Sequence, residues 1–226
     1  MTSPESVNSS IADRIFQIKQ EIPPQVKLIA VSKYATVEAM REAYSAGIRD
    51  FGESRVQEAI AKKQQLQNLA DITWHMIGTL QSNKARQALL NFDWIHAVDR
   101  LSLAQQLDRL ILETNKQIKI CLQVKPAHDP RKFGWSEQEL IADLPALDAC
   151  PNLQIMGLMT ILPQGLDKSQ SLNLFKKVAD LKARLQLGQW QSLKNLRELS
   201  MGMSMDYDSA IASGATMIRV GSKIFG

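Results

Sequence analysis

The stretch Lys27-Leu28-Ile29-Ala30-Val31-Ser32-Lys33 predicts a buried β-strand that ends at a lysine. Its apolar residues follow one another without alternation, as in the strands of a parallel sheet that is covered on both faces. Thr36 lies three residues further on and is a suitable N-cap for a helix whose end Gly47 marks. This unit of strand, loop and helix therefore predicts an α/β fold with Lys33 at the carboxyl end of a strand.

The same unit recurs along the whole chain. Apolar segments predict eight strands, at 27–32, 50–52, 73–78, 92–97, 118–124, 154–159, 196–200 and 217–220. Helical patterns lie between them, at 36–47, 56–69, 82–90, 101–114, 136–150, 169–187 and 205–213. Eight alternating units predict a single (β/α)8 TIM-type barrel domain over residues 1–226. An open doubly wound sheet is the alternative, and the lack of a GxGxxG turn after a strand favours the barrel.

A further helix is predicted before the first strand. Ser3 is a candidate N-cap with Pro4 in the first turn, and Pro23-Pro24 ends the helix. The apolar stripe of this helix consists of Ile11, Ile15, Ile18 and Ile22. Because the chain stops at Gly226, soon after the eighth strand, we expect the usual eighth helix to be missing. The N-terminal helix would then cover the gap, and no second domain is expected.

The composition excludes several classes of protein. The 226 residues are 45% hydrophobic and carry a formal charge of +4 from 27 basic and 23 acidic residues, which suits a globular domain without a basic nucleic-acid-binding surface. No apolar run is long enough to span a bilayer, and the polar N-terminal residues predict no signal peptide. Cys121 and Cys150 form no CxxC pair, and the three histidines lack metal-ligand spacing. We therefore expect a cytoplasmic protein that binds neither nucleic acid, membrane nor metal.

Two loops near the C-terminus favour a phosphate site. Ser200-Met201-Gly202-Met203-Ser204 follows the seventh strand, and Arg219-Val220-Gly221-Ser222 ends the eighth. The loops after these two strands of a barrel often bind phosphate, and small or hydroxylated residues allow backbone N–H groups to approach it. The alternative is that Gly202 and Gly221 only permit tight turns.

Lys33 would share one rim of the barrel with this phosphate site, because the first strand neighbours the eighth. An amine in a partly dry pocket can lose its proton and form an imine with an aldehyde. The two features together predict a phosphorylated aldehyde as ligand, and pyridoxal 5′-phosphate (PLP) is one. The alternative is a lysine that ends a strand and reaches water. His96 with Asp99, and the loop 128–132, are weaker candidates on the same rim.

Several motifs in the same order resemble those of one family. They are Ala30-Val31-Ser32-Lys33, Phe51-Gly52-Glu53, Val56-Gln57-Glu58, Trp74-His75-Met76-Ile77-Gly78, Leu80-Gln81-Ser82-Asn83-Lys84, Lys132-Phe133-Gly134, Gly157-Leu158-Met159, the two C-terminal loops, and Lys223-Ile224-Phe225-Gly226. The chain thereby resembles the YggS/PROSC family of PLP-binding proteins, also called PLP homeostasis proteins. The resemblance implies the barrel of the alanine racemase N-terminal domain.

The resemblance also implies roles for individual residues. Lys33 would carry PLP as a Schiff base, and Arg219 would point toward the pyridine ring. The phosphate group would lie against Ser200, Gly202, Gly221 and Ser222, with Met203 as a further cofactor-binding residue. Ser54, His75 and Met76 would lie near the ring. Ser54 departs from the family, which often has Asn at this position.

A role in turnover is not expected. Alanine racemases carry a C-terminal β-domain that supplies a catalytic tyrosine, and no such domain is expected here. The first hypothesis is a PLP-binding protein of vitamin B6 and amino-acid homeostasis, without substantial catalytic turnover. The alternatives are a PLP-dependent amino-acid racemase of narrow range and a Schiff-base aldolase without PLP. PLP-dependent apoenzymes or a regulatory protein are candidate partners, and a monomer is expected.

Overall fold

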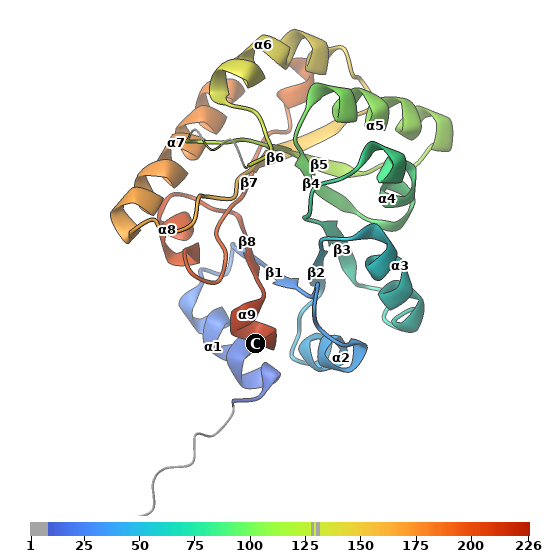
Figure 1. The fold of residues 1–226 in the computed structure, drawn as a ribbon, viewed down its shortest axis with the longest axis vertical. Helices are drawn as coiled ribbons and strands as arrows, with labels where there is room; N and C mark the ends of the chain where they lie inside the picture. Colours follow the sequence, from blue (N-terminus) through green and yellow to red (C-terminus); the bar gives the residue numbers. More distant parts are fainter. Residues whose placement is uncertain (1–8, 128, 130–131) are drawn as a thin grey trace, which may run out of the picture.

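A computed structural model describes residues 9–127, 129 and 132–226. Eight parallel strands form a closed barrel in chain order, so that β1 pairs with both β2 and β8. The strands are β1 (Lys27–Val31), β2 (Asp50–Glu53), β3 (Thr73–Met76), β4 (Trp94–Val98), β5 (Lys119–Gln123), β6 (Gln154–Met159), β7 (Glu198–Ser200) and β8 (Met217–Val220). The helices lie around this barrel (Figure 1). The predicted (β/α)8 barrel is confirmed, and an open sheet is excluded.

The helices follow the predicted ones with small shifts at their ends. They are α1 (Ile11–Glu21), α2 (Val37–Ser45), α3 (Val56–Gln65), α4 (Ala85–Asn91), α5 (Leu101–Thr114), α6 (Glu137–Asp148), α7 (Lys168–Gln186), α8 (Tyr207–Ala212) and α9 (Ser222–Phe225). Two 3₁₀ turns, Ser82–Lys84 and Gln191–Leu193, accompany them. Thr36 caps α2 as predicted, because its hydroxyl accepts a hydrogen bond from the N–H of Ala39.

The N-terminal helix begins later than the sequence suggested. Ser10 is its N-cap and forms a reciprocal capping box with Asp13, whereas Ser3 and Pro4 lie outside the described residues. The helix buries Ile15 and Ile18 and contacts both α2 and α9. The expectation that no helix follows the eighth strand was wrong, because α9 adds one turn there and buries Ile224. The N-terminal helix nevertheless occupies the gap beside this short turn (Figure 1).

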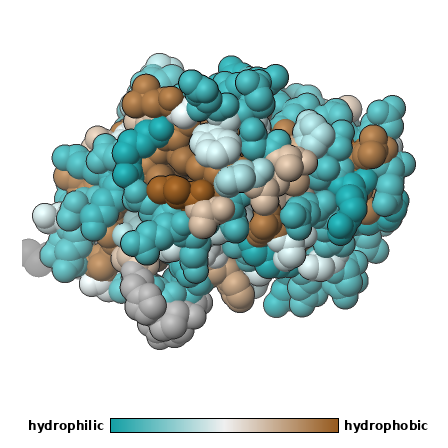
Figure 2. All heavy atoms as spheres, turned by 90° about the horizontal axis from the view of Figure 1, so that it is seen from above, coloured by the Kyte–Doolittle hydropathy of each residue, from teal (hydrophilic) through white to brown (hydrophobic). Residues whose placement is uncertain are grey.

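The apolar side chains form two clusters. The larger one fills the space between the barrel and its helices, and a smaller one contains inward-facing residues such as Ile29, Trp94 and Met159. Polar side chains are buried alongside this inner cluster, and we return to them below. The face shown in Figure 2 is largely hydrophilic, with hydrophobic side chains gathered in one larger brown area and in smaller spots. In the part of the chain that the structure describes, no helix has the length and apolar character needed to cross a membrane.

Candidate functional site

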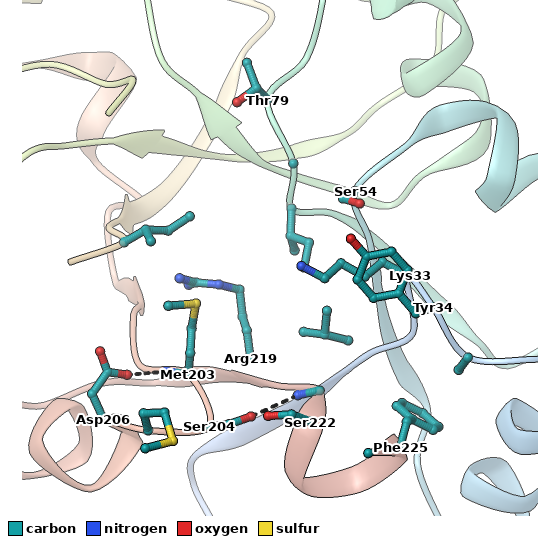
Figure 3. Close-up of a pocket in the computed structure, with 18 of the residues that line it drawn as sticks. Lys33, Tyr34, Ser54, Thr79, Met203, Ser204, Asp206, Arg219, Ser222 and Phe225 are labelled. Atoms are coloured by element: carbon teal, nitrogen blue, oxygen red, sulfur yellow. Dashed lines mark hydrogen bonds between the residues drawn. The ribbon is translucent and has the colours of Figure 1, made fainter. Parts of the chain in front are cut away.

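A pocket of about 670 Å³ opens at the carboxyl ends of the strands, where Lys33 lies. It is lined by residues at the ends of β1, β2, β3, β5, β6, β7 and β8 or in the loops that follow them. They are Val31, Lys33, Tyr34, Ala35, Ser54, Ile77, Gly78, Thr79, Gln123, Ile161, Met203, Ser204, Met205, Asp206, Arg219, Gly221, Ser222, Phe225 and Gly226. Lys33 enters the pocket from the β1 side and Arg219 from β8, while Ser204 and Ser222 lie on one wall (Figure 3). The geometry thus brings an amine, a guanidinium and two hydroxyls to one concave site.

Lys33 follows β1 by two residues and is exposed to the pocket. Its Nζ lies 5.2 Å from the centre of the Tyr34 ring, which is itself 87% exposed. The amine is therefore accessible to a ligand. The sequence predicted an amine in a partly dry pocket. Solvent instead reaches the Lys33 amine beside Tyr34.

The backbone at Lys33 is held from behind by a buried ion pair. Lys62 Nζ lies 2.8 Å from Glu53 Oε1 and donates a further hydrogen bond of 2.6 Å to the carbonyl oxygen of Ser32. The Ser32 hydroxyl donates to the same Glu53 oxygen over 2.7 Å. These contacts fix the peptide that precedes Lys33, whose side chain extends into the pocket.

The loop after β7 is shaped by a glycine and an aspartate. Gly202 has φ +94°, and a Cβ added there would lie 2.6 Å from Ala210 Cβ. The N–H of Met203 donates to Asp206 Oδ1 over 2.6 Å. Burial raises the pKa of the Asp206 carboxyl above its ordinary value. One backbone donor of the predicted phosphate loop is therefore already engaged by an acidic side chain.

The loop after β8 presents the start of α9 to the pocket. Gly221 is the N-cap of this helix, and its N–H makes a long hydrogen bond of 3.4 Å to the hydroxyl of Ser204. The first N–H groups of a helix have no partner within the helix and point toward its N-terminal side. The Ser222 hydroxyl and these N–H groups could donate hydrogen bonds to a bound anion.

Arg219 is 3% exposed and held by two fixed contacts. Its NH1 group donates to the Ser200 hydroxyl over 2.6 Å, and its NH2 group donates to the carbonyl oxygen of Thr160 over 2.8 Å. Burial lowers the pKa of the guanidinium to about 10, so it stays charged at neutral pH. A cation whose orientation is set from within the barrel thus forms one side of the pocket.

Two buried histidines continue this chain of contacts away from the pocket. Ser200 Oγ lies 2.7 Å from His96 Nδ1, and His96 Nε2 lies 2.9 Å from His75 Nδ1. His75 Nε2 then lies 2.9 Å from Asp50 Oδ1 at the start of β2. Burial lowers the pKa of both imidazoles below the ordinary value, which keeps them neutral.

The predicted site residues divide into two groups. Lys33, Ser54, Met203, Arg219, Gly221 and Ser222 line the pocket, and Gly202 shapes its loop. Ser200, His75 and Met76 are buried below the pocket and are not among its lining residues. The hydroxyl that lines the pocket from the first loop belongs to Ser204 instead.

The weaker candidates His96 and Asp99 are not among the residues that line the pocket. Asp99 pairs with Arg100 over 2.6 Å, whereas His96 belongs to the buried chain of contacts. His128, Pro130 and Arg131 of the loop 128–132 lie outside the described residues. The sequence analysis missed the pocket residues Tyr34, Thr79, Asp206 and Phe225. Tyr34 could have been found from its position next to Lys33, and Asp206 from its place directly after the glycine and serine loop.

Comparison with known proteins defines the family. The family model "Alanine racemase, N-terminal domain" matches residues 8–226. A protein of Synechocystis sp. named pyridoxal phosphate homeostasis protein is 49% identical over 93% of this chain and 95% of its own length. The protein of that name from Pseudomonas aeruginosa is 38% identical over 96% of both chains. The chain belongs to the pyridoxal phosphate homeostasis protein family. The resemblance inferred from the motifs is confirmed.

Solved structures agree with this family assignment. PipY of Synechococcus elongatus, solved with PLP bound, has a TM-score of 0.91 and 50% identity, covering 96% of this chain and all of the PipY chain. The structure of PipY without PLP has a TM-score of 0.92. An alanine racemase of Clostridium difficile shares the fold at 16% identity, with a TM-score of 0.72, and this chain covers 55% of it.

Proposed function

We propose that the protein binds PLP as a Schiff base on Lys33 and serves vitamin B6 and amino-acid homeostasis without substantial turnover. The observation that carries this proposal is the meeting of Lys33, Arg219 and the two hydroxyl-bearing loops in one pocket. Lys33 would hold the aldehyde carbon of PLP as an imine with release of water, the two loops would donate hydrogen bonds to its phosphate, and the Arg219 guanidinium would face its pyridine ring. PLP bound to the related PipY, at 50% identity, supports this choice of ligand.

The residues present suit this cofactor. The pocket volume of about 670 Å³ lies within the range of cofactor sites. Ser204, Ser222 and the first N–H groups of α9 are donors for a phosphate, whereas Ser200 would act indirectly through Arg219. Gly202 is required because a side chain there would collide with α8. When bound, PLP supplies a reactive aldehyde and an electron-withdrawing ring.

One feature is shared with racemases, and a second supports a carrier. A guanidinium only donates hydrogen bonds, so Arg219 would leave the pyridine nitrogen unprotonated and weaken the ring as an electron sink, as the equivalent arginine of alanine racemases would. Of the tyrosines near the site, Tyr207 is buried, and its hydroxyl contacts Glu21 and Lys223. Burial and the contact with Glu21 raise the pKa of this phenol above its ordinary value, so it stays protonated at neutral pH and cannot accept a proton from a substrate. Tyr34 is the tyrosine that lines the pocket, so a racemase of narrow range would depend on it.

The test is borohydride reduction of the protein incubated with PLP, followed by peptide mass spectrometry. We expect a pyridoxyl-phosphate adduct on Lys33 and loss of the imine absorbance in Lys33→Ala. An adduct confined to another lysine would overturn the site. An assay of α-proton exchange with amino acids, with Tyr34→Phe as the matched variant, separates the two activities. Exchange that Lys33→Ala abolishes would overturn the carrier function.

We also propose a compartment, an oligomeric state and partners for this protein. The protein acts as a cytoplasmic monomer, and its partners are PLP-dependent apoenzymes or a regulatory protein. Both cysteines are free and buried, which suits a reducing compartment. Tyr34 and Met205 are 87% and 94% exposed at the edge of the pocket, so a partner that takes PLP from Lys33 would meet them first.

A further inference from the structure

The buried contacts that extend from Arg219 have a defined direction. A guanidinium can only donate, so Ser200 Oγ must accept from Arg219 NH1. The other partner of Ser200 Oγ among the described residues is His96 Nδ1, at 2.7 Å. Because a buried hydroxyl needs an acceptor for its own proton, the Ser200 O–H donates to His96 Nδ1. His96 therefore carries its proton on Nε2.

The same reasoning continues through the next ring. The Nε2–H of His96 donates to His75 Nδ1 over 2.9 Å, which leaves the proton of His75 on Nε2. His75 then donates to the Asp50 carboxylate over 2.9 Å. All four hydrogen bonds thus run in one direction, from Arg219 to Asp50, and both imidazoles are neutral.

This chain of contacts crosses the barrel. Arg219 lies in the pocket at the carboxyl ends of the strands, whereas Asp50 and its ion-pair partner Lys27 begin β2 and β1. A second pocket, of about 560 Å³, is lined by Lys27 and Asp50 at that opposite end. The rings are packed tightly, since His75 stacks on Trp94 with 5.9 Å between ring centres. Neither His75 nor His96 has exposed surface. Water therefore cannot take the place of a hydrogen-bond partner that either ring loses.

We propose that Asp50, His75, His96 and Ser200 form a positioning relay that fixes Arg219 toward the ligand and connects it to the opposite end of the barrel. The role of Arg219 toward PLP rests on the proposed function, whereas the relay itself exists in the ligand-free protein. Its members are positioning residues, because each acts on the ligand through Arg219.

A single added proton can create an alternative arrangement of the relay. A doubly protonated His75 would donate to His96 Nε2 as well as to Asp50. His96 would then carry its proton on Nδ1 and donate to Ser200, so the Ser200 O–H would lose its acceptor. The charged groups that face the two rings are Asp50, Asp93, Lys27 and Arg219. The carboxylates favour this extra proton, while burial and the two cations oppose it.

The first test reads the histidine protons directly. Nitrogen-15 NMR of the imidazoles in PLP-free protein, assigned with His75→Gln and His96→Gln, is expected to show both rings neutral with the proton on Nε2 at pH 7.5. On acidification, protonation of His75 should move the His96 proton to Nδ1. A proton on Nδ1 of either ring at pH 7.5, or an imidazolium at that pH, would overturn the relay.

A matched pair of variants tests the link to the opposite end. Asp50→Asn removes the carboxylate that favours a protonated His75. The His96 proton should therefore move to Nδ1 at a lower pH in this variant than in the wild type. Asp71→Asn is the control, because Asp71 lies just before β3 at the same end but pairs with Arg49 and Tyr44. An equal shift in both variants, or no shift in Asp50→Asn, would overturn the coupling.

A third measurement connects the relay to the ligand. Ser200→Ala leaves the NH1 group of Arg219 and the Nδ1 of His96 without partners. We expect it to weaken PLP binding about tenfold, measured by imine absorbance, because Arg219 would lose the hydrogen bond that holds it toward the ligand. The control is Ser209→Ala, a buried serine on α8 outside the relay.

The outcomes distinguish the two proposals. An unchanged PLP affinity in Ser200→Ala, with the imine still on Lys33, would overturn the relay and leave the proposed function intact. A wild-type protein without any PLP adduct would overturn the proposed function, while the histidine protons would still decide whether the relay exists.

Discussion

Lys62 Nζ lies 2.8 Å from Glu53 Oε1, and this ion pair is buried directly behind the peptide that precedes Lys33. Glu53 has no exposed surface, and its second carboxylate oxygen has no hydrogen-bond partner within the described chain. A buried pair of this kind contributes little as a whole, but removing one partner leaves an uncompensated charge. The pair is therefore a sensitive support for the residue that we propose to carry PLP.

Lys62→Met tests this support. We expect it to lower the free energy of unfolding by about 3–5 kcal/mol, because Glu53 would remain buried without its cation. Urea unfolding measures the change, and the double variant Glu53→Gln/Lys62→Met should recover part of it. Arg55→Met is the control, since Arg55 forms an exposed pair with Glu58 on the same helix and should change stability little. Equal losses in Lys62→Met and Arg55→Met would contradict this account.

Gly202 provides a second test, because its backbone and its neighbours both exclude a side chain. Gly202→Ala would combine a φ of +94° with a Cβ 2.6 Å from Ala210 Cβ. Gly214→Ala is the matched control, since Gly214 has φ +91° and no atom within 4 Å of an added Cβ. The control should lose about 1–2 kcal/mol from backbone strain alone. Gly202→Ala should lose more and also bind PLP more weakly, as thermal unfolding with and without PLP would show. Equal losses would mean that the contact with α8 is unimportant.

The sequence predicted the barrel well because its signals are local. Strands such as β1 and β6 are largely apolar runs, and Thr36 and Ser136 mark helix starts through their own side chains. Lys33 was predictable for the same reason, because a residue that follows a strand of a barrel must lie on the rim. The sequence also predicted both C-terminal loops from their small residues.

The direction of individual side chains was harder to predict. Ser200 and Ser204 belong to one motif, but Ser200 ends β7 and faces inward, while Ser204 lies in the loop and reaches the pocket. His75 likewise faces the barrel interior, where its partners come from β2 and β4. These contacts join residues 21 to 104 positions apart in the chain, so no local pattern announces them. Ser10 caps α1 because Asp13 completes a capping box there, and the predicted cap Ser3 lies outside the described residues.

The neutral histidines predict how stability depends on pH. Burial lowers the pKa of His75 and His96 in the folded state, whereas each has a pKa of about 6.5 when unfolded. Below that pH the unfolded chain binds more protons than the folded one, so the free energy of unfolding must fall as the pH decreases. Two histidines give a slope of up to about 2.7 kcal/mol per pH unit between the folded and unfolded pKa values. Urea unfolding from pH 8 to pH 5 measures this slope.

A variant isolates the histidine contribution to this slope. His75→Gln keeps an amide between Asp50 and His96 but removes one titrating ring. We expect the slope of the free energy of unfolding against pH to fall by about half. Above pH 7 the pH dependence of this free energy should change little. A slope that is the same in the wild type and in His75→Gln would show that other groups govern the acid sensitivity.

We expect the Asp206 carboxylate to lower the affinity of the pocket for a phosphate, whereas the hydroxyls of the two serines would raise it. Its carboxylate accepts the N–H of Met203 and lines the same pocket as Ser204 and Ser222. A bound phosphate would therefore face a negative charge as well as hydroxyl donors. Asp206→Asn keeps an oxygen acceptor for Met203 and removes the charge. PLP should bind about fivefold more tightly to this variant, which corresponds to about 1 kcal/mol of relieved repulsion.

The pH dependence of this effect separates charge from shape. Burial raises the pKa of Asp206, so the wild-type carboxyl becomes neutral at a higher pH than an ordinary aspartate. The difference in PLP affinity between wild type and Asp206→Asn should therefore shrink as the pH falls. Asp208→Asn is the control, because Asp208 is exposed and does not line this pocket. Titrations of imine absorbance at several pH values provide the measurement. A constant difference across pH would mean that the amide changes the loop rather than its charge, and a similar gain in Asp208→Asn would assign the effect to net charge alone.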